Sequence, residues 1–346
     1  MTKQQKFAIG VATSVGAAYV AGRLVRRRHA ISFANRVVVI TGGSRGLGLV
    51  MARMFAQEGA RLVLIARDVD ELARARADVE ASARAVSGQP SDVMIVRCDV
   101  RRRADVRAAV DAIVERWGGI DVLVNNAGVI QVGPFEHMTR EDFDNAMATH
   151  FWGPLHLMIE IAPIMRHRGF GRIVNIASIG GKVGVPHLVP YCASKFALVG
   201  LSDAARAELA RYGVRVTTVA PGLMRTGSPV NAQFKGRHAA EYAWFKISSS
   251  IPGLTVSAER AAARILDACR HGDAALTITA QATAAALLNA AIPDAVAHAM
   301  ALVSRALPGP GGWLGNEVKR GAESEPIGAP RLLTMLTDEA AAANNE

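Results

Sequence analysis

The chain has 346 residues, half of them hydrophobic, and a net charge of +10; this length suits one large domain with terminal extensions or a small second module. Its many arginines stand at helical spacing among alanines without interleaved aromatic residues, which argues against a nucleic-acid partner and favours solvated helix faces. The three cysteines, Cys98, Cys192 and Cys269, lack disulfide-framework or metal-ligand spacing, so we expect no metal and a reducing compartment.

The N-terminal segment is an uncharged run, Phe7–Gly22, followed closely by Arg26–Arg28. As a helix it spans about 24 Å, and flanking arginines can snorkel to approach the hydrocarbon thickness of about 30 Å. We therefore expect residues 1–34 to be an apolar helical anchor that binds membrane lipid, with the catalytic part facing the cytoplasm. A cleaved signal peptide and a helix packed on the protein itself remain alternatives.

From Asn35, apolar β-branched runs alternate with helical patterns. The predicted strands are Arg36–Ile40, Arg61–Ala66, Asp92–Arg97, Ile120–Val124, Arg172–Ala177, Val214–Val219 and Ala275–Thr279. The predicted helices include Gly46–Gln57, Arg103–Trp117, Glu141–His167, Pro190–Tyr212 and Ala258–His271. This alternation predicts an α/β fold over residues 35–280, a Rossmann-type doubly wound parallel sheet of about seven strands with helices on both faces.

Two regions depart from this alternation. Residues 223–257 are far longer than an ordinary strand-to-helix connection and contain several aromatic residues, which predicts a substrate lid loop. Residues 281–346 are expected to form a C-terminal extension, first helical and alanine-rich with a break at Pro293, then a polar tail.

The first predicted strand runs into TGGSRGLG, Thr41–Gly48. Gly42 permits a tight turn, while Gly46 and Gly48 let the backbone and a helix N-terminus approach a diphosphate. We therefore predict a dinucleotide site at this turn. Its expected contacts are Gly42, Ser44, Arg45, Gly46, Leu47 and Gly48.

The residues after the second predicted strand indicate which dinucleotide binds. An acidic residue at the strand end would bind the ribose 2′-hydroxyl of NAD, but this place reads Ala66-Arg67, with Asp68 one position later. Arg67 and Arg45 together offer two guanidinium groups for a 2′-phosphate, so we expect NADP(H). Asp68 could instead meet the ribose, which keeps NAD as the alternative.

Several motifs occur together in one order: the glycine turn, Asn125–Gly128 after the fourth strand, Ser178, Tyr191–Lys195 and Pro221-Gly222. With these motifs, residues 35–279 resemble the short-chain dehydrogenase/reductase family. The resemblance implies an oxidoreductase that interconverts a carbonyl and an alcohol by hydride transfer. It also implies further cofactor contacts: Asp99 and Val100 at the adenine, Asn126, Ala127 and Gly128 near the adenine ribose, and Pro221, Gly222 and Thr226 at the nicotinamide.

The chemistry of three residues fits this reaction. A carbonyl that accepts hydride needs a proton, and Tyr191 can donate one. Lys195 lies one helical turn further, where its charge would lower the pKa of the phenol and its ammonium would bind the nicotinamide ribose, so both residues also count as cofactor contacts. Ser178 offers a hydroxyl that orients the substrate oxygen.

The sequence departs from the family at one site. Where the family has an asparagine on the long helix, in a proton path to the lysine, this chain has His150, followed by Phe151-Trp152-Gly153. Histidine can bind water and relay protons, so we count His150 with the catalytic residues. The alternative is a buried structural histidine.

The apolar N-terminus and the aromatic residues of the lid suggest a lipophilic substrate, such as a fatty-acyl, isoprenoid or steroid-like carbonyl. A homo-oligomer is a possible assembly. A second function class stays open, in which the chain is a catalytically weak NADP-binding sensor or scaffold. The intact Ser178, Tyr191 and Lys195 favour the enzyme.

Overall fold

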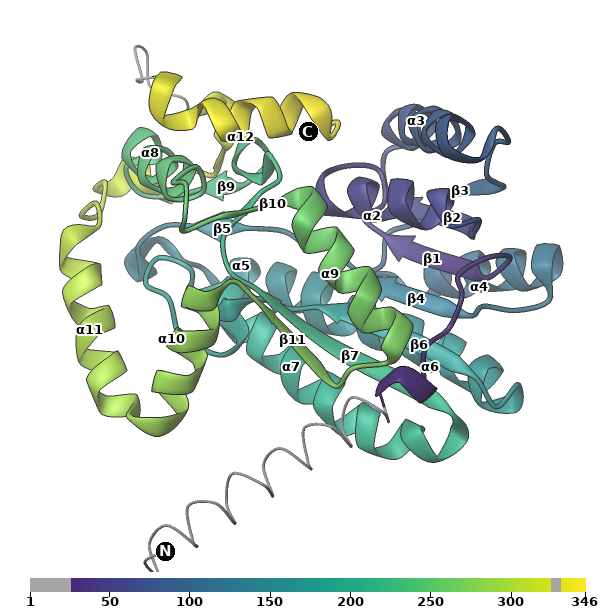
Figure 1. Ribbon diagram of the computed structural model, residues 1–346. Helices are drawn as coiled ribbons and strands as arrows, with labels where there is room; N and C mark the ends of the chain where they lie inside the picture. Colours follow the sequence, from purple (N-terminus) through teal and green to yellow (C-terminus); the bar gives the residue numbers. More distant parts are fainter. Residues whose placement is uncertain (1–25, 325–330) are drawn as a thin grey trace, which may run out of the picture.

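The computed structural model describes residues 26–324 and 331–346, and its centre is a seven-stranded parallel sheet (Figure 1). The strand order is β11-β7-β6-β4-β1-β2-β3. Their bounds are β1 Val37–Thr41, β2 Arg61–Ala66, β3 Val93–Arg97, β4 Val122–Asn125, β6 Gly171–Ile176, β7 Val214–Pro221 and β11 Ala275–Ile278. The predicted α/β fold with about seven parallel strands is confirmed.

Helices cover both faces of the sheet. One face carries α2 (Gly46–Gln57), α3 (Val69–Ser87) and α9 (Ala258–His271); the other carries α4 (Arg103–Trp117), α6 (Gly153–His167) and α7 (Val189–Leu209). Strand β1 supplies both cores, because Val38 and Ile40 pack on the first face while Val37 and Val39 pack on the second. This burial on both sides explains why the strands read as continuous apolar runs.

The long helix predicted over residues 141–167 is interrupted in the structure. Helix α5 (Arg140–Met147) passes into a π-helical turn, η2 (Ala148–Trp152), before α6 continues the same path. Hydrophobic periodicity does not reveal a π-turn, because it is read over a window of roughly 11–18 residues, which is longer than this single turn. The turn contains His150.

Residues 223–257 are more ordered than the predicted lid loop. They contain β8 (Met224–Arg225), β9 (Gln233–Phe234), α8 (His238–Ser248) and β10 (Val256–Ser257). Strand β9 joins β5 (Gln131–Val132) and β12 (Lys319–Arg320) in a small sheet. A third apolar core lies beneath α8 and includes Val132, Phe234, Tyr242 and Phe245.

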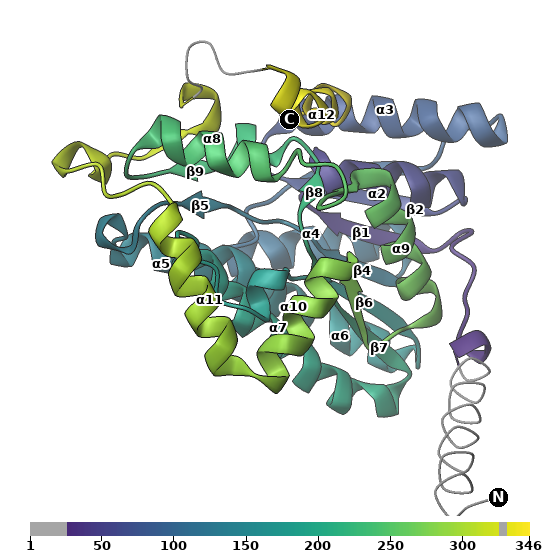
Figure 2. The same cartoon turned by 60° about the vertical axis from the view of Figure 1, so that its left-hand side comes forward.

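The C-terminal extension begins as a helical hairpin, α10 (Ala280–Ala291) and α11 (Pro293–Ala306), with Pro293 starting the second helix. The segment predicted as a polar tail contains a further helix, α12 (Arg331–Ala343), which the sequence did not indicate. This helix lies over α8, and its end comes close to α2 and α3 (Figures 1 and 2). An Asp338–Lys246 ion pair of 2.8 Å helps to hold α12 on α8.

Most of the predicted apolar anchor, residues 1–25, lies outside the described residues. The described chain starts at Arg26, whose guanidinium pairs with Asp273 at 2.8 Å, beside the end of α9. Within residues 26–324 and 331–346, no helix is long and apolar enough to cross a membrane.

Candidate active site

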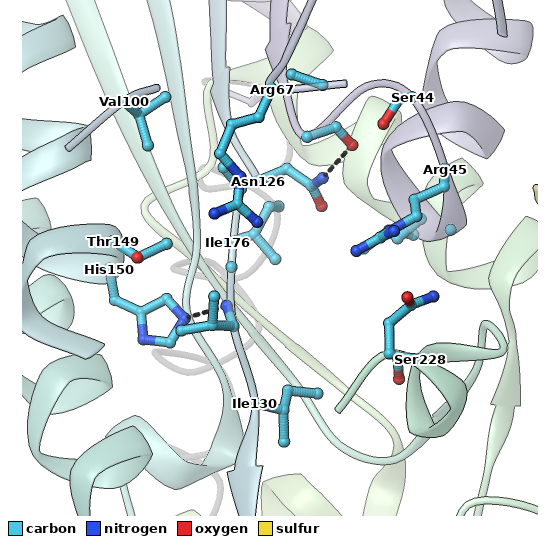
Figure 3. Close-up of a pocket in the computed structure, with 18 of the residues that line it drawn as sticks. Ser44, Arg45, Arg67, Val100, Asn126, Ile130, Thr149, His150, Ile176 and Ser228 are labelled. Atoms are coloured by element: carbon cyan, nitrogen blue, oxygen red, sulfur yellow. Dashed lines mark hydrogen bonds between the residues drawn. The ribbon is translucent and has the colours of Figure 1, made fainter. Parts of the chain in front are cut away.

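A cavity of about 660 Å³ opens at the carboxyl ends of the central strands. The chain leaves β1 toward β2 and β3 and then returns to β4 on the other side of β1. In an open parallel sheet this reversal leaves a crevice in which ligands bind. Figure 3 shows the side chains that line it, from Arg67 and Arg45 to His150 and Ile130.

The glycine turn has little free space. Gly42 has a φ of 63°, in the left-handed region that favours glycine. A Cβ on Gly48 would lie 2.0 Å from the carbonyl oxygen of Gly42, so any side chain there would push α2 away from the turn. The two glycines thus bring the N-terminus of α2 against the end of β1, which suits it to receive an anion.

Asn126 ties the glycine turn to the end of β4. Its side-chain amide donates to the carbonyl oxygens of Thr41 and Gly42, each at 3.1 Å. In return, the Thr41 hydroxyl accepts hydrogen bonds of 3.0 Å from the backbone amides of Asn126 and Ala127. The residue predicted to support the adenine ribose therefore also fixes the shape of the turn.

The end of β2 presents one exposed cation to the cavity. Arg67 lines the cavity and points into it (Figure 3), and no described carboxylate lies within ion-pair distance of it. Asp68, by contrast, caps α3: its carboxylate accepts from the backbone amide of Glu71 at 2.9 Å, and this bond lowers the pKa of Asp68. The cap gives the Asp68 carboxylate a partner other than a ribose.

Arg45 also faces the cavity, but its charge is shared. It pairs with Glu71 at 3.0 Å, and Glu71 also accepts a hydrogen bond of 3.0 Å from the Ser44 hydroxyl. Glu346, from the far end of the chain, lies 3.5 Å from Arg45. The sequence did not indicate either carboxylate.

The predicted adenine contacts, Asp99 and Val100, both line the cavity. Asp99 pairs with Arg101 at 2.6 Å, and this partner lowers the pKa of the Asp99 carboxyl. The segment after β3 therefore contributes to the cavity wall, as expected of a crevice formed by successive strand ends.

Tyr191 and Lys195 project from the same face of α7 into the cavity. The Lys195 ammonium lies 5.7 Å from the centre of the Tyr191 ring and donates to the carbonyl oxygen of Ile176 at 2.8 Å. Ser178 follows β6 and hydrogen-bonds to Tyr191, while its Oγ accepts from the backbone amide of Gly180 at 3.1 Å. Helix α7 and the end of β6 thus bring these three side chains together.

Burial controls the protonation of this group. It raises the pKa of Tyr191 to about 12, although the hydrogen bond from Ser178 acts in the opposite direction. Burial also lowers the pKa of Lys195 to about 7. The expected lowering of the Tyr191 pKa by Lys195 is therefore not seen, because desolvation is the larger effect.

His150 is buried between two partners. Its Nε2 accepts from the backbone amide of Val129 at 3.1 Å, and its Nδ1 lies 2.7 Å from the Oγ of Ser194. Because the Ser194 hydroxyl donates to the carbonyl oxygen of Tyr191 at 2.8 Å, Nδ1 must carry the proton in its own bond. Burial, assisted by the nearby charge of Lys195, lowers the pKa of His150 well below 6.5 and keeps the ring neutral.

Most predicted site residues line one cavity, and four do not. Those that line it are Gly42, Ser44, Arg45, Gly46, Leu47, Arg67, Asp99, Val100, Asn126, Ala127, Gly128, His150, Tyr191, Lys195 and Thr226. Gly48 packs beneath the turn and Ser178 reaches the cavity through Tyr191. Pro221 ends β7, and the backbone amide of Gly222 donates to the carbonyl oxygen of Ile278; neither residue lines the cavity.

Sequence reasoning missed the wall contributed by the later part of the chain. Asn231, Arg320 and Glu346 line the cavity, from the lid region, β12 and the residues after α12. These residues belong to no recognisable motif. For Arg320, the signal would have been the pairing of β12 with β9, but strands of two residues leave no periodicity to detect.

Comparison with known proteins places this geometry in a family. The sequence profile described as short chain dehydrogenase matches residues 36–234. An uncharacterised oxidoreductase of Mycobacterium bovis is 44% identical over 192 residues, which is 55% of this chain and 74% of the relative.

Two solved structures extend the comparison. The L-sorbose reductase of Gluconobacter frateurii, solved with NADPH and L-sorbose, is 28% identical with a TM-score of 0.63 and covers 72% of this chain and 97% of its own. The actinorhodin polyketide ketoreductase, solved with NADPH, is 32% identical with a TM-score of 0.62 and covers 70% and 95%. With its profile match, parallel sheet and cavity, this chain belongs to the short-chain dehydrogenase/reductase family and is an oxidoreductase.

Proposed function

We propose that this oxidoreductase uses NADP(H) to interconvert a carbonyl and an alcohol, with Tyr191 as the acid–base residue. The observation that carries the proposal is that Tyr191 and Lys195 line one cavity with the glycine turn, and that Ser178 hydrogen-bonds to Tyr191 there. The residues present fit a nicotinamide dinucleotide, since Gly48 leaves room for the close approach of α2 and Arg67 supplies an exposed cation.

The bound cofactor supplies or accepts the hydride at the substrate carbon. In reduction, the Tyr191 hydroxyl transfers its proton to the carbonyl oxygen as the C–H bond forms, and in oxidation the phenolate takes this proton back. Ser178 holds the substrate oxygen beside Tyr191. Lys195, when protonated, stabilises the phenolate that remains.

The protonation states favour reduction at neutral pH. A Tyr191 pKa of about 12 keeps the phenol protonated, so the proton donor is ready before substrate arrives. A Lys195 pKa of about 7 means that its ammonium and amine forms are both populated there. We propose that an anionic cofactor favours the ammonium form, because it places negative charge in the same cavity.

Removing the Tyr191 hydroxyl should abolish turnover. We expect Tyr191→Phe to lower kcat by at least about 100-fold, since one acid–base group contributes about 10²–10⁴-fold. NADPH affinity, measured by fluorescence, should stay within about threefold. Tyr212→Phe removes a phenol outside the cavity and serves as the matched control. If Tyr191→Phe retained wild-type turnover, the acid–base assignment would be wrong. A different result would favour the sensor function: binding of NADPH by the native chain without reduction of any carbonyl in a broad panel.

We propose a preference for NADP(H) over NAD(H) that depends on Arg67. Arg67 is exposed and points into the cavity, whereas Asp68 is engaged as the cap of α3. Arg45 makes a smaller contribution, because Glu71 already balances part of its charge. The two neighbouring structures solved with NADPH support the same choice.

Reversing this charge should reverse the preference. In Arg67→Asp, loss of attraction and new repulsion toward the 2′-phosphate should lower kcat/KM for NADPH about 10- to 100-fold and leave that for NADH little changed. Arg84→Asp makes the same charge change on an exposed part of α3 and should have no effect. An unchanged NADPH/NADH ratio in Arg67→Asp would remove Arg67 from cofactor selection.

We propose that His150 is a neutral structural brace, the second of the two roles considered from the sequence. Both ring nitrogens have protein partners, Val129 and Ser194, so neither is available to a water chain without breaking a bond. Its lowered pKa also makes the ring a poor proton acceptor near neutral pH. The brace fixes α7, and through it Tyr191, against the π-turn.

Replacing His150 should affect stability more than chemistry. His150→Ala leaves a cavity and an unpaired Val129 amide, so we expect a loss of about 2–4 kcal/mol in unfolding free energy. The kcat per folded molecule should change less than about threefold. Chemical denaturation and active-site-titrated kinetics measure the two effects separately. A proton relay would instead produce a fall in kcat of about 10- to 100-fold without loss of stability.

We propose a lipophilic substrate and a membrane location, with residues 1–28 as the anchor and the catalytic domain on the cytoplasmic side. Apolar side chains support the first proposal, because Val129, Ile130 and Met224 line the cavity together with Tyr191. The uncharged run of residues 7–22 supports the second.

Membrane attachment can be tested by sedimentation. The full chain should sediment with membranes and resist about 1 M salt, because insertion of apolar surface is not screened. Deletion of residues 1–25 should move the protein to the supernatant with NADPH binding intact. A variant with Arg27→Ala and Arg28→Ala tests whether charge alone is responsible. Release of the full chain by salt would show adsorption and contradict the anchor.

A further inference from the structure

The residues that follow α12 lie directly on the glycine turn. The carbonyl oxygen of Asn344 accepts a hydrogen bond of 2.8 Å from the backbone amide of Gly46. The side chain of Asn345 donates to the carbonyl oxygen of Ser44 at 2.9 Å. A Cβ placed on Gly46 would lie only 2.5 Å from a carboxylate oxygen of Glu346. We call residues 344–346 the tail tip.

The tail tip is held from both sides of the cavity. On the nucleotide side, Arg53 of α2 donates to the Asn344 side chain at 3.0 Å, and Arg74 of α3 donates to Asn345 at 3.1 Å. On the opposite side, the Asn231 amide donates to Glu346 at 2.7 Å. These contacts span the mouth of the cavity, so the tail tip bridges its two walls.

Glu346 makes the contacts that an anionic ligand would make. Its carboxylate lies at the N-terminus of α2, 3.5 Å from Arg45, and only 7% of its side chain is exposed. A helix N-terminus and a guanidinium are what the diphosphate of a dinucleotide requires. Burial raises the pKa of Glu346, while Arg45 acts to lower it, as expected for a carboxylate that depends on a cationic partner.

A diphosphate at the glycine turn would compete for the same groups. The Gly46 amide is occupied by Asn344, and the space above Gly46 is occupied by Glu346. A carboxylate and a diphosphate at one helix N-terminus would also repel each other. Tail tip and cofactor therefore exclude each other in this arrangement.

We propose that the tail tip is an autoinhibitory contact: it occupies the diphosphate position of the cofactor site and must leave before the dinucleotide binds. The inference rests on the proposed cofactor site at the glycine turn. Helix α12 need not move, because its attachment to α8 through Asp338 and Lys246 lies away from the tail tip. Cofactor affinity is then reduced by the fraction of molecules in which the tail tip is bound.

Deleting the tail tip should tighten cofactor binding. We expect deletion of residues 344–346 to lower the Kd for NADPH about tenfold, the result if about one molecule in ten is open in the native chain. Glu346→Gln, which removes only the charge, should lower it about threefold. The matched control is Glu339→Gln, which makes the same change at an exposed position of α12 and should leave the Kd unaltered. Thermal melts verify that each variant is folded.

Hydrogen exchange of the native chain provides a second measurement. If NADPH displaces the tail tip, amide exchange at residues 344–346 should become faster when NADPH is added. Slower exchange there, or weaker binding after the deletion, would show that the tail tip closes over the cofactor and would overturn the proposal. Equal NADPH affinity of native and deleted chains would also overturn it while leaving the cofactor site in place. Absence of NADPH binding in both chains would instead refute the cofactor site itself.

Discussion

The joint between the ends of β1 and β4 is the constraint on which the rest of the site depends. Gly48 allows α2 to pack against the carbonyl of Gly42, and the Asn126 amide holds the same turn from the other strand. Because backbone atoms meet here at contact distance, the turn has little freedom to adjust. This joint positions three parts of the cavity wall: the N-terminus of α2, the end of β2 with Arg67, and Gly128 after β4.

Burial then determines what the positioned groups can do. Tyr191, Lys195 and His150 lie within one desolvated region, and in each case burial favours the uncharged form. A phenol that keeps its proton is suited to donate it, and a neutral histidine with two partners is suited to hold a helix in place. Burial acts on both rings, and their hydrogen bonds make the difference. Tyr191 is suited to the proposed catalytic role, whereas His150, with both nitrogens bonded, is suited to the proposed structural role.

The sequence was sufficient for features that depend on local pattern. The strands were predictable because they are buried on both faces, and the pairing of Tyr191 with Lys195 because their spacing is one helical turn. The π-turn around His150 was not predictable, since it is a single turn and is shorter than the window over which apolar periodicity is read. Likewise, no local signal places Glu346 beside Arg45, because this contact joins distant parts of the chain through polar groups alone.

The charge balance at Arg45 links the tail tip to the proposed cofactor site. This guanidinium faces two carboxylates, Glu71 and Glu346, which differ in how they are held. Glu71 belongs to the first turn of α3, whereas Glu346 occupies the place above Gly46 that we propose for the diphosphate. Neither of these two carboxylates forms an ion pair with Arg67. If the tail tip and the cofactor compete as proposed, the free energy of cofactor binding is a difference between two anions at the α2 N-terminus. The proposed discrimination between NADP(H) and NAD(H) then depends mainly on Arg67, which has no ion pair among the described residues.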